Sequence, residues 1–178
     1  MTAVPVPRTW TAGEIVTASN MNTFISNVDS FLLNPPIMQV RQTVAQSPAT
    51  AAYTALTFDT EDLDSANMHS TVTNTTRATA VYPGWYHFFG GTSWAGNATG
   101  RRGGTWGING VSAGAAGEVL SSPAGAAVIE VPQRPIFLFL NVGDYVELQA
   151  FQDSGGALAT FVTNLRNHPT MNCRWESN

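Results

Sequence analysis

The spacing of apolar residues changes once along the chain, near residue 36, and this change predicts two unlike parts. Between residues 17 and 34, apolar residues recur three and four positions apart, which is the repeat of one helical face. This stripe consists of Met21, Phe24, Ile25, Val28, Phe31 and Leu32. Thr17 is the expected N-cap, and a pair of prolines ends the pattern. We therefore predict a helix of about 16 residues and about 24 Å.

From residue 37 onward, apolar and polar residues alternate between turns rich in Gly, Asn, Pro and Ser, which predicts short β-strands. The expected strands cover residues 38–44, 53–58, 71–73, 78–81, 85–89, 103–108, 128–131, 136–140, 145–150, 158–162 and 173–175. We expect about eight to ten strands from these eleven candidate segments, which is typical of a sandwich or jelly roll. Segment 136–140 is apolar on both faces, so it needs a cover on both sides.

These patterns define the predicted fold class: mainly β, an antiparallel jelly-roll sandwich preceded by an extended arm and one short N-terminal helix. Residues 1–36 form the predicted arm and attachment helix, and residues 37–178 form the predicted head. On the arm, Trp10 and Ile15 are apolar and need a cover. Because a short helix is marginal alone in water, its stripe also needs a partner. That partner is copies of the helix, the head of its own chain, or another protein.

Composition narrows the chemistry. All eight basic residues are Arg, so a Schiff-base lysine and a lysine-containing phosphate loop are excluded. With a net charge of −4 and no cluster of cations, we expect no nucleic-acid binding. No apolar stretch approaches the length of a membrane span, so we expect no membrane insertion. Cys173 is the only cysteine, which rules out an intramolecular disulfide, and we expect it to be buried in the last strand.

Two motifs resemble the complement/tumour-necrosis-factor-like globular head. Residues 83–88, Pro-Gly-Trp-Tyr-His-Phe, resemble its Gly-x-Tyr-x-Phe strand, and residues 140–148 resemble its Leu-x-x-Gly-Asp-x-Val-x-Leu hairpin. Asn109-Gly110 and Gly143-Asp144 suit the tight turns that such hairpins need. The resemblance implies three-fold homotrimers. The doubly apolar segment and the low content of charged residues favour the same association, because a closed ring would bury apolar faces.

The N-terminal segment carries a second resemblance. Residues 8–22 resemble the leader Trp-x-x-Gly-Glu-x-Val-Thr-Ala-x-x-Leu/Met-Asn of many phage tail-fibre and minor-tail proteins, especially those of actinobacterial phages. It implies a structural component of a virion, made in the host cytoplasm: a trimeric fibre or tail-associated protein with a head for host adsorption. The alternative is a capsid decoration protein that stabilises the head shell. The residues expected to attach the protein to the virion are Trp10, Ile15, Met21, Phe24, Ile25 and Val28.

A glycine-rich stretch suggests where the head could contact a host glycan or protein. The candidate ligand surface comprises Trp94, Arg101, Arg102 and Trp106. Aromatic and Arg side chains suit sugar and protein surfaces, and loops on a rigid scaffold often carry binding function. The alternative interpretation is a mobile hairpin between two core strands.

Acidic and histidine residues are the remaining candidates. The acidic run Asp59, Glu61, Asp62 and Asp64 could hold calcium, but EF-hand spacing fails and a solvated loop is the favoured interpretation. The histidines His69, His87 and His168 are not at metal-ligand spacing, and His87 is expected to be a packed or interface residue. No catalytic constellation stands out, so we expect a non-enzyme without a cofactor. A polysaccharide hydrolase is the most remote alternative, since carboxylates far apart in sequence can converge.

Overall fold

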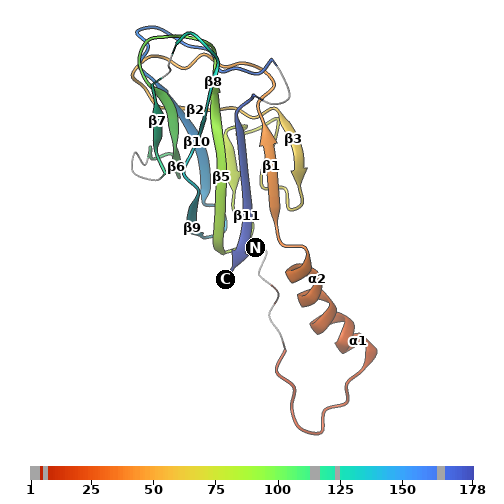
Figure 1. Cartoon of the computed structure of the whole chain (residues 1–178). Helices are drawn as coiled ribbons and strands as arrows, with labels where there is room; N and C mark the ends of the chain where they lie inside the picture. Colours follow the sequence, from red (N-terminus) through yellow and green to blue (C-terminus); the bar gives the residue numbers. More distant parts are fainter. Residues whose placement is uncertain (1–4, 6–7, 113–116, 123–124, 164–166) are drawn as a thin grey trace.

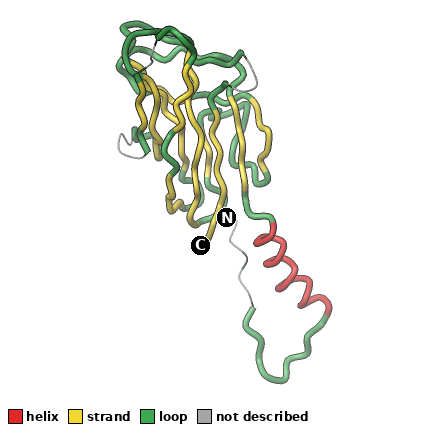
Figure 2. The backbone as a smooth tube through the Cα atoms, in the orientation of Figure 1, coloured by secondary structure: helices red, strands yellow, loops and turns green. Residues whose placement is uncertain are grey.

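The structure, a computed structural model, describes residues 5, 8–112, 117–122, 125–163 and 167–178. Two antiparallel sheets face each other in a sandwich, and a helical leader projects from one end of it (Figure 1). Figure 2 shows strands throughout the head and helix only in the leader. The predicted fold class, a mainly β sandwich preceded by one short helix, is confirmed.

The larger sheet has six strands, and it contains both the first and the last strand of the head. Its strands are β1 (Ile37–Arg41), β3 (Thr60–Asp64), β5 (Gly84–Trp94), β8 (Ile129–Pro132), β9 (Ile136–Leu140) and β11 (Thr170–Ser177). Their order is β3-β1-β11-β5-β8, and β9 also pairs with β5. The first and last strands of the head therefore lie side by side, with Ile37 opposite Arg174.

The second sheet has five strands and closes the other side of the sandwich. Its strands are β2 (Thr54–Ala55), β4 (Arg77–Thr79), β6 (Arg102–Ile108), β7 (Val119–Ser121) and β10 (Tyr145–Gln152). Their order is β2-β10-β6-β7, and β4 also pairs with β10. Asn109 and Gly110 follow β6 with φ of 51° and 78°, and Gly143 precedes β10 with φ of 92°. The predicted tight turns thus have the left-handed backbone that Asn and Gly tolerate.

The core lies between the sheets and follows the predicted alternation. Its largest fully buried apolar side chains are Trp94, Trp106, Tyr86, Phe58, Phe88, Met38, Leu56, Met68, Leu148 and Met171. Val146, Leu148 and Ala150 face inward from β10, and Cys173 is buried in β11 as expected. Burying each large apolar side chain contributes about 1.5–3 kcal/mol, so this layer is the main source of the stability of the head.

Several strand predictions are wrong for local reasons. Residues 71–73 form turns instead of a strand, because the backbone amides of Val72 and Thr73 donate to the Ser70 hydroxyl at 3.2 Å. Such side-chain bonds compete with sheet formation. Residues 158–162 are irregular apart from one bridge between Trp94 and Thr160. Conversely, β7 was not predicted, and β1 ends before Val44.

The helix of the leader spans the predicted 16 residues in three parts: α1 (Ala18–Met21), a π-helical turn η1 (Asn22–Ser26) and α2 (Asn27–Leu33). The Thr17 hydroxyl accepts the Asn20 amide at 3.2 Å, which confirms the N-cap. Phe31 packs edge-on against Tyr82 and Trp175, with ring centroids 5.0 and 4.9 Å away. The head of the same chain is therefore one partner of the helix. Among the described residues, no helix is both long and apolar enough to cross a membrane.

Candidate functional site

An aromatic face covers part of the outer side of the six-stranded sheet. Because Tyr86 and Phe88 point into the core, the intervening residues of β5 must point outward. Phe137 and Phe139 of β9 point outward for the same reason, since Leu140 points inward. We define the aromatic face as Trp85, His87, Phe89, Phe137 and Phe139.

The register between β5 and β9 brings these side chains into contact. Trp85 lies opposite Phe139, and His87 lies opposite Phe137. The first pair meets edge-on with ring centroids 5.8 Å apart, and the second pair is stacked at 4.4 Å with an interplanar angle of 7°. The His87 ring is also 5.6 Å from the Phe89 ring. Cross-strand aromatic pairs of this kind form a rigid, preorganised surface.

This surface is exposed although it is apolar. Trp85, Phe89, Phe137 and Phe139 keep 44%, 41%, 59% and 49% of their accessible area. Contiguous apolar patches on a protein surface mark sites of association. Residues 136–140 were expected to need a cover on both faces. The core covers the inner face, and no described part of this chain covers the outer face. The sequence signal was that aromatic or aliphatic residues occupy both odd and even positions of segments 85–89 and 136–140.

Charged residues border the aromatic face. Arg174 lies opposite His87 on β11, and the Glu176 carboxylate is 4.0 Å from the His87 ring nitrogen Nδ1. An apolar centre with a charged rim is the usual anatomy of a protein–protein interface. The prediction that His87 is a packed or interface histidine agrees with its stacking on Phe137.

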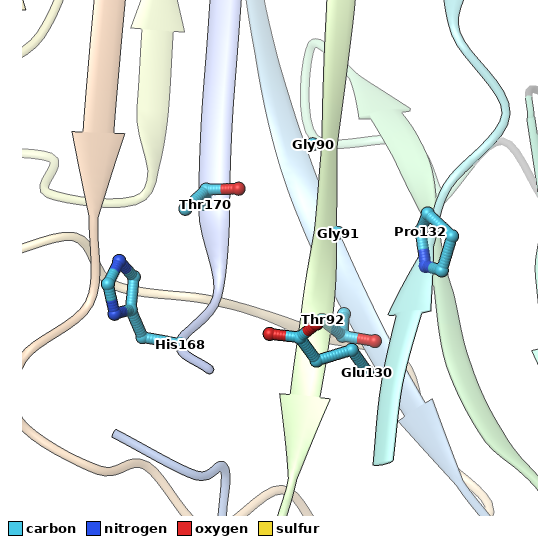
Figure 3. A pocket seen from close by; sticks show the side chains of 7 residues that line it. All are labelled: Gly90, Gly91, Thr92, Glu130, Pro132, His168 and Thr170. Carbon is cyan, nitrogen blue, oxygen red and sulfur yellow. The ribbon is translucent and has the colours of Figure 1, made fainter. Parts of the chain in front are cut away.

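A shallow groove lies further along β5, beyond Phe89. Its volume is about 250 Å³, and it is lined by Gly90, Gly91, Thr92, Glu130, Pro132, His168 and Thr170. Figure 3 shows Glu130 beside Thr92 and His168 apart from them, on the side of the strand that carries Thr170. The glycines themselves serve packing, because a Cβ at Gly90 would lie 2.2 Å from the Thr170 carbonyl oxygen. The groove thus has a structural explanation that requires no ligand.

The arm folds back onto the helix. The Arg8 guanidinium lies 4.9 Å from the ring centroids of both Trp10 and Phe24, and it forms an ion pair with Glu14. Trp10 and Phe24, two of the predicted attachment residues, are consequently half-buried within the leader itself. Val28 is also half-buried.

The other predicted attachment residues remain open to solvent. Ile15, Met21 and Ile25 are exposed, and Leu32 and Leu33 are exposed near the end of the helix. The leader therefore has apolar side chains free for a partner, and their role in attachment to a virion stays a prediction.

The candidate ligand surface is wrong for three of its four residues. Trp94, Trp106 and Arg102 are fully buried, and the exposed Arg101 pairs with Asp153 at 2.7 Å. Trp94 and Trp106 point between the sheets, where their large rings fill the core. A Trp beside glycine and Arg in the sequence suggests a binding loop. In a strand, however, successive side chains alternate between the two faces, and this alternation directs the Trp inward.

The buried Arg102 has a structural role. Its guanidinium donates to the carbonyl oxygens of Asn97 and Thr99 at 2.8 and 2.6 Å, which ties down the turn between β5 and β6. Burial lowers the pKa of this guanidinium from its usual value. The glycine-rich stretch, residues 90–104, is thus anchored by a buried cation near its C-terminal end.

The acidic run does not form a calcium site. Each carboxylate has its own partner: Asp59 accepts from Thr43, Glu61 contacts His69, Asp62 pairs with Arg41, and Asp64 accepts from the His69 amide. Residues 60–64 form the edge strand β3 and not a solvated loop, because these partners neutralise or satisfy the acidic side chains. Within the described ranges, no three His, Cys, Asp or Glu side chains gather closely enough to hold a metal ion.

Comparisons with known proteins extend to the fold alone. No family model and no curated protein sequence matches this chain. Among solved structures, the globular domain of zebrafish complement 1qA protein is similar with a TM-score of 0.57 and 17% identity, over 80% of this chain and 99% of that chain. Murine APRIL at pH 5.0 is similar with a TM-score of 0.56 and 10% identity, over 80% of this chain and 100% of that chain. The head therefore shares the jelly-roll fold of these two proteins, as its two motifs indicated.

Proposed function

We propose that this protein is a homotrimeric structural component of a bacteriophage virion, associated with the tail or its fibres. The head forms the trimer through its aromatic face, and the leader attaches the trimer to the particle. The observation that carries the proposal is the exposed aromatic face on β5 and β9, which a single copy leaves in contact with water.

Three copies satisfy this surface better than one. Rigid aromatic anchors surrounded by charged residues are typical of the centre of a stable interface. Trp85, Phe137 and Phe139 provide such anchors, and Arg174 and Glu176 lie at their border. The resemblance of residues 83–88 and 140–148 to the trimeric globular head supports a three-fold arrangement. A closed ring buries every copy of the face and leaves none exposed for uncontrolled association.

The leader supports attachment to a particle. It projects away from the head in Figure 1, and its residues 8–22 resemble the attachment leader of phage tail proteins. Ile15 on the arm is 80% exposed, so an apolar contact is available beyond the head. Trp94, Arg102 and Trp106 are buried, so none of the three is available to bind a host surface.

Two measurements test the proposal. Native mass spectrometry of the purified full chain at micromolar concentration should give three times 19.0 kDa, and a monomer would contradict the trimer. Immunogold labelling of phage particles from cells that produce the chain should mark the tail. Labelling confined to capsids would favour the shell-decorating alternative, and particles without label would refute a virion role.

A further inference from the structure

The helix of the leader carries a second exposed apolar surface that the head does not cover. Met21, Ile25 and Leu32 keep 42%, 37% and 62% of their accessible area. Phe24 and Phe31 point toward the arm and the head instead, where they contact Arg8 and Tyr82. One side of the helix is thus used within the chain, and a neighbouring side remains free.

The free residues follow the spacing of a coiled-coil seam. Met21, Ile25 and Leu32 are four and seven positions apart, which is close to the seven-residue repeat of a coiled coil, and the half-buried Val28 lies between them. We name these four residues the seam. From Met21 to Leu32, the seam is about 16 Å long. Asp29 is the only ionisable side chain between residues 18 and 33, so like-charge repulsion does not keep copies apart.

Because the helix is attached to the head, the same helix in other copies of the chain is a suitable partner for its exposed side. Three residues separate α2 from β1, and Phe31 is held between Tyr82 and Trp175. Each helix therefore keeps a defined position relative to its own head. Joining three heads raises the effective concentration of three helices, which allows a seam too short to associate alone to do so.

We infer that the seam packs against the seams of the two other copies and forms a short three-helix coil beside the trimeric head. This inference rests on the proposed trimer and refines the role of the leader. Met21 and Ile25 then hold copies together, and Ile15 and Val16 of the arm, which are exposed, remain for the particle.

Disulfide cross-linking of the full chain tests the inference. Cys173 is buried in β11, and burial raises the pKa of its thiol, so the native cysteine should not react. Ile25→Cys places a thiol in the seam, and Thr23→Cys places one on an exposed position outside it. Both positions are solvent-exposed in the single chain, so neither substitution should disturb folding. Under mild oxidation, we expect Ile25→Cys to form linked dimers on a non-reducing gel about tenfold faster than Thr23→Cys, independently of dilution.

The mass of the same samples distinguishes a failure of the seam from a failure of the proposed trimer. A trimer in which the two cysteine variants cross-link at equal rates would overturn the seam and leave the proposed trimer intact. A monomeric sample would overturn the trimer and, with it, the seam. Met21→Cys provides an independent repeat, and it should behave like Ile25→Cys.

Discussion

The two sheets have opposite kinds of outer face. The six-stranded sheet exposes aromatic rings, as at Trp85 and Phe137. The outward positions of β10 in the five-stranded sheet carry Glu147 and Gln149 instead, and these side chains are nearly buried by their own chain. Glu147 accepts the Thr76 hydroxyl at 2.6 Å and, with Arg77 nearby, is satisfied without a second molecule.

The difference shows where the fold is complete and where it needs a partner. A polar group is satisfied by one or two well-placed hydrogen bonds, which a neighbouring strand can supply. An apolar ring stabilises the protein only when its surface is buried, by about 25 cal/mol per Å² of area removed from water. The aromatic face therefore requires a large covering surface, whereas Glu147 on the five-stranded sheet does not.

The largest expected effect comes from placing charge on the aromatic face. Phe137→Glu combined with Phe139→Glu should convert the trimer to a folded monomer, because burying carboxylates in an apolar contact is costly. Native mass spectrometry measures the assembly, and circular dichroism checks the fold. Val72→Glu, at a turn residue that is 83% exposed, is the matched control and should remain trimeric. A trimeric double variant would show that the copies associate elsewhere.

Replacing one tryptophan of the core and one of the aromatic face should separate the contributions of these residues to folding and to assembly. In the monomeric double-Glu background, Trp106→Ala should lower the free energy of unfolding by about 3–5 kcal/mol, because it opens a cavity in the core. Trp85→Ala should change it by under about 0.5 kcal/mol, as expected for a surface residue. Urea unfolding followed by circular dichroism measures both. Equal effects would mean that the outer face already contributes to the stability of a single copy.

Breaking the ion pair between Arg77 and Glu147 on the five-stranded sheet should have an intermediate effect on the free energy of unfolding. Arg77 also stacks over Tyr145, with its guanidinium 4.0 Å from the ring centroid. Arg77→Met should lower the free energy of unfolding by about 1–3 kcal/mol, because the Glu147 carboxylate loses its cationic neighbour. Adding Glu147→Gln should restore part of this loss, since no charge then remains to be desolvated. A double variant no more stable than Arg77→Met, in urea unfolding, would contradict this account.

The smallest expected effect is a pH dependence at one turn. Hydrogen bonds from the Asn141 amide and then from the Asn109 side chain hold the pKa of Asp144 below its usual value. This carboxylate therefore stabilises the folded chain above the usual Asp pKa of about 3.9, and its contribution is lost as the pH falls through the lowered value. Asp144→Asn should flatten that part of the profile of melting temperature against pH. A profile that keeps its low-pH slope in Asp144→Asn would contradict this assignment.

Residue order alone predicted much of the head and little of the candidate site. Alternation identified β5 and separated Tyr86 and Phe88 from Trp85 and Phe89, because successive residues of a strand point to opposite sides. The structure then placed Tyr86 and Phe88 inside. The same rule, applied from Arg102 onward, would have buried Trp106, but glycine-rich composition pointed to a binding loop. The failure at residues 71–73 came from Ser70, whose hydroxyl takes the backbone amides that a strand would have used.

The sequence by itself determined the helix with its Thr17 cap, most of the strands and which residues of a strand share a side. These properties depend on neighbours within a few positions, so a local pattern is enough to predict them. Only the tertiary structure decided which outward residues are covered. It set β5 beside β9, so that aromatic residues 50 positions apart form one face, and it brought Phe31 against Trp175 while leaving Ile25 exposed. Cover depends on segments distant in the chain, and a local repeat carries no information about which of them will meet.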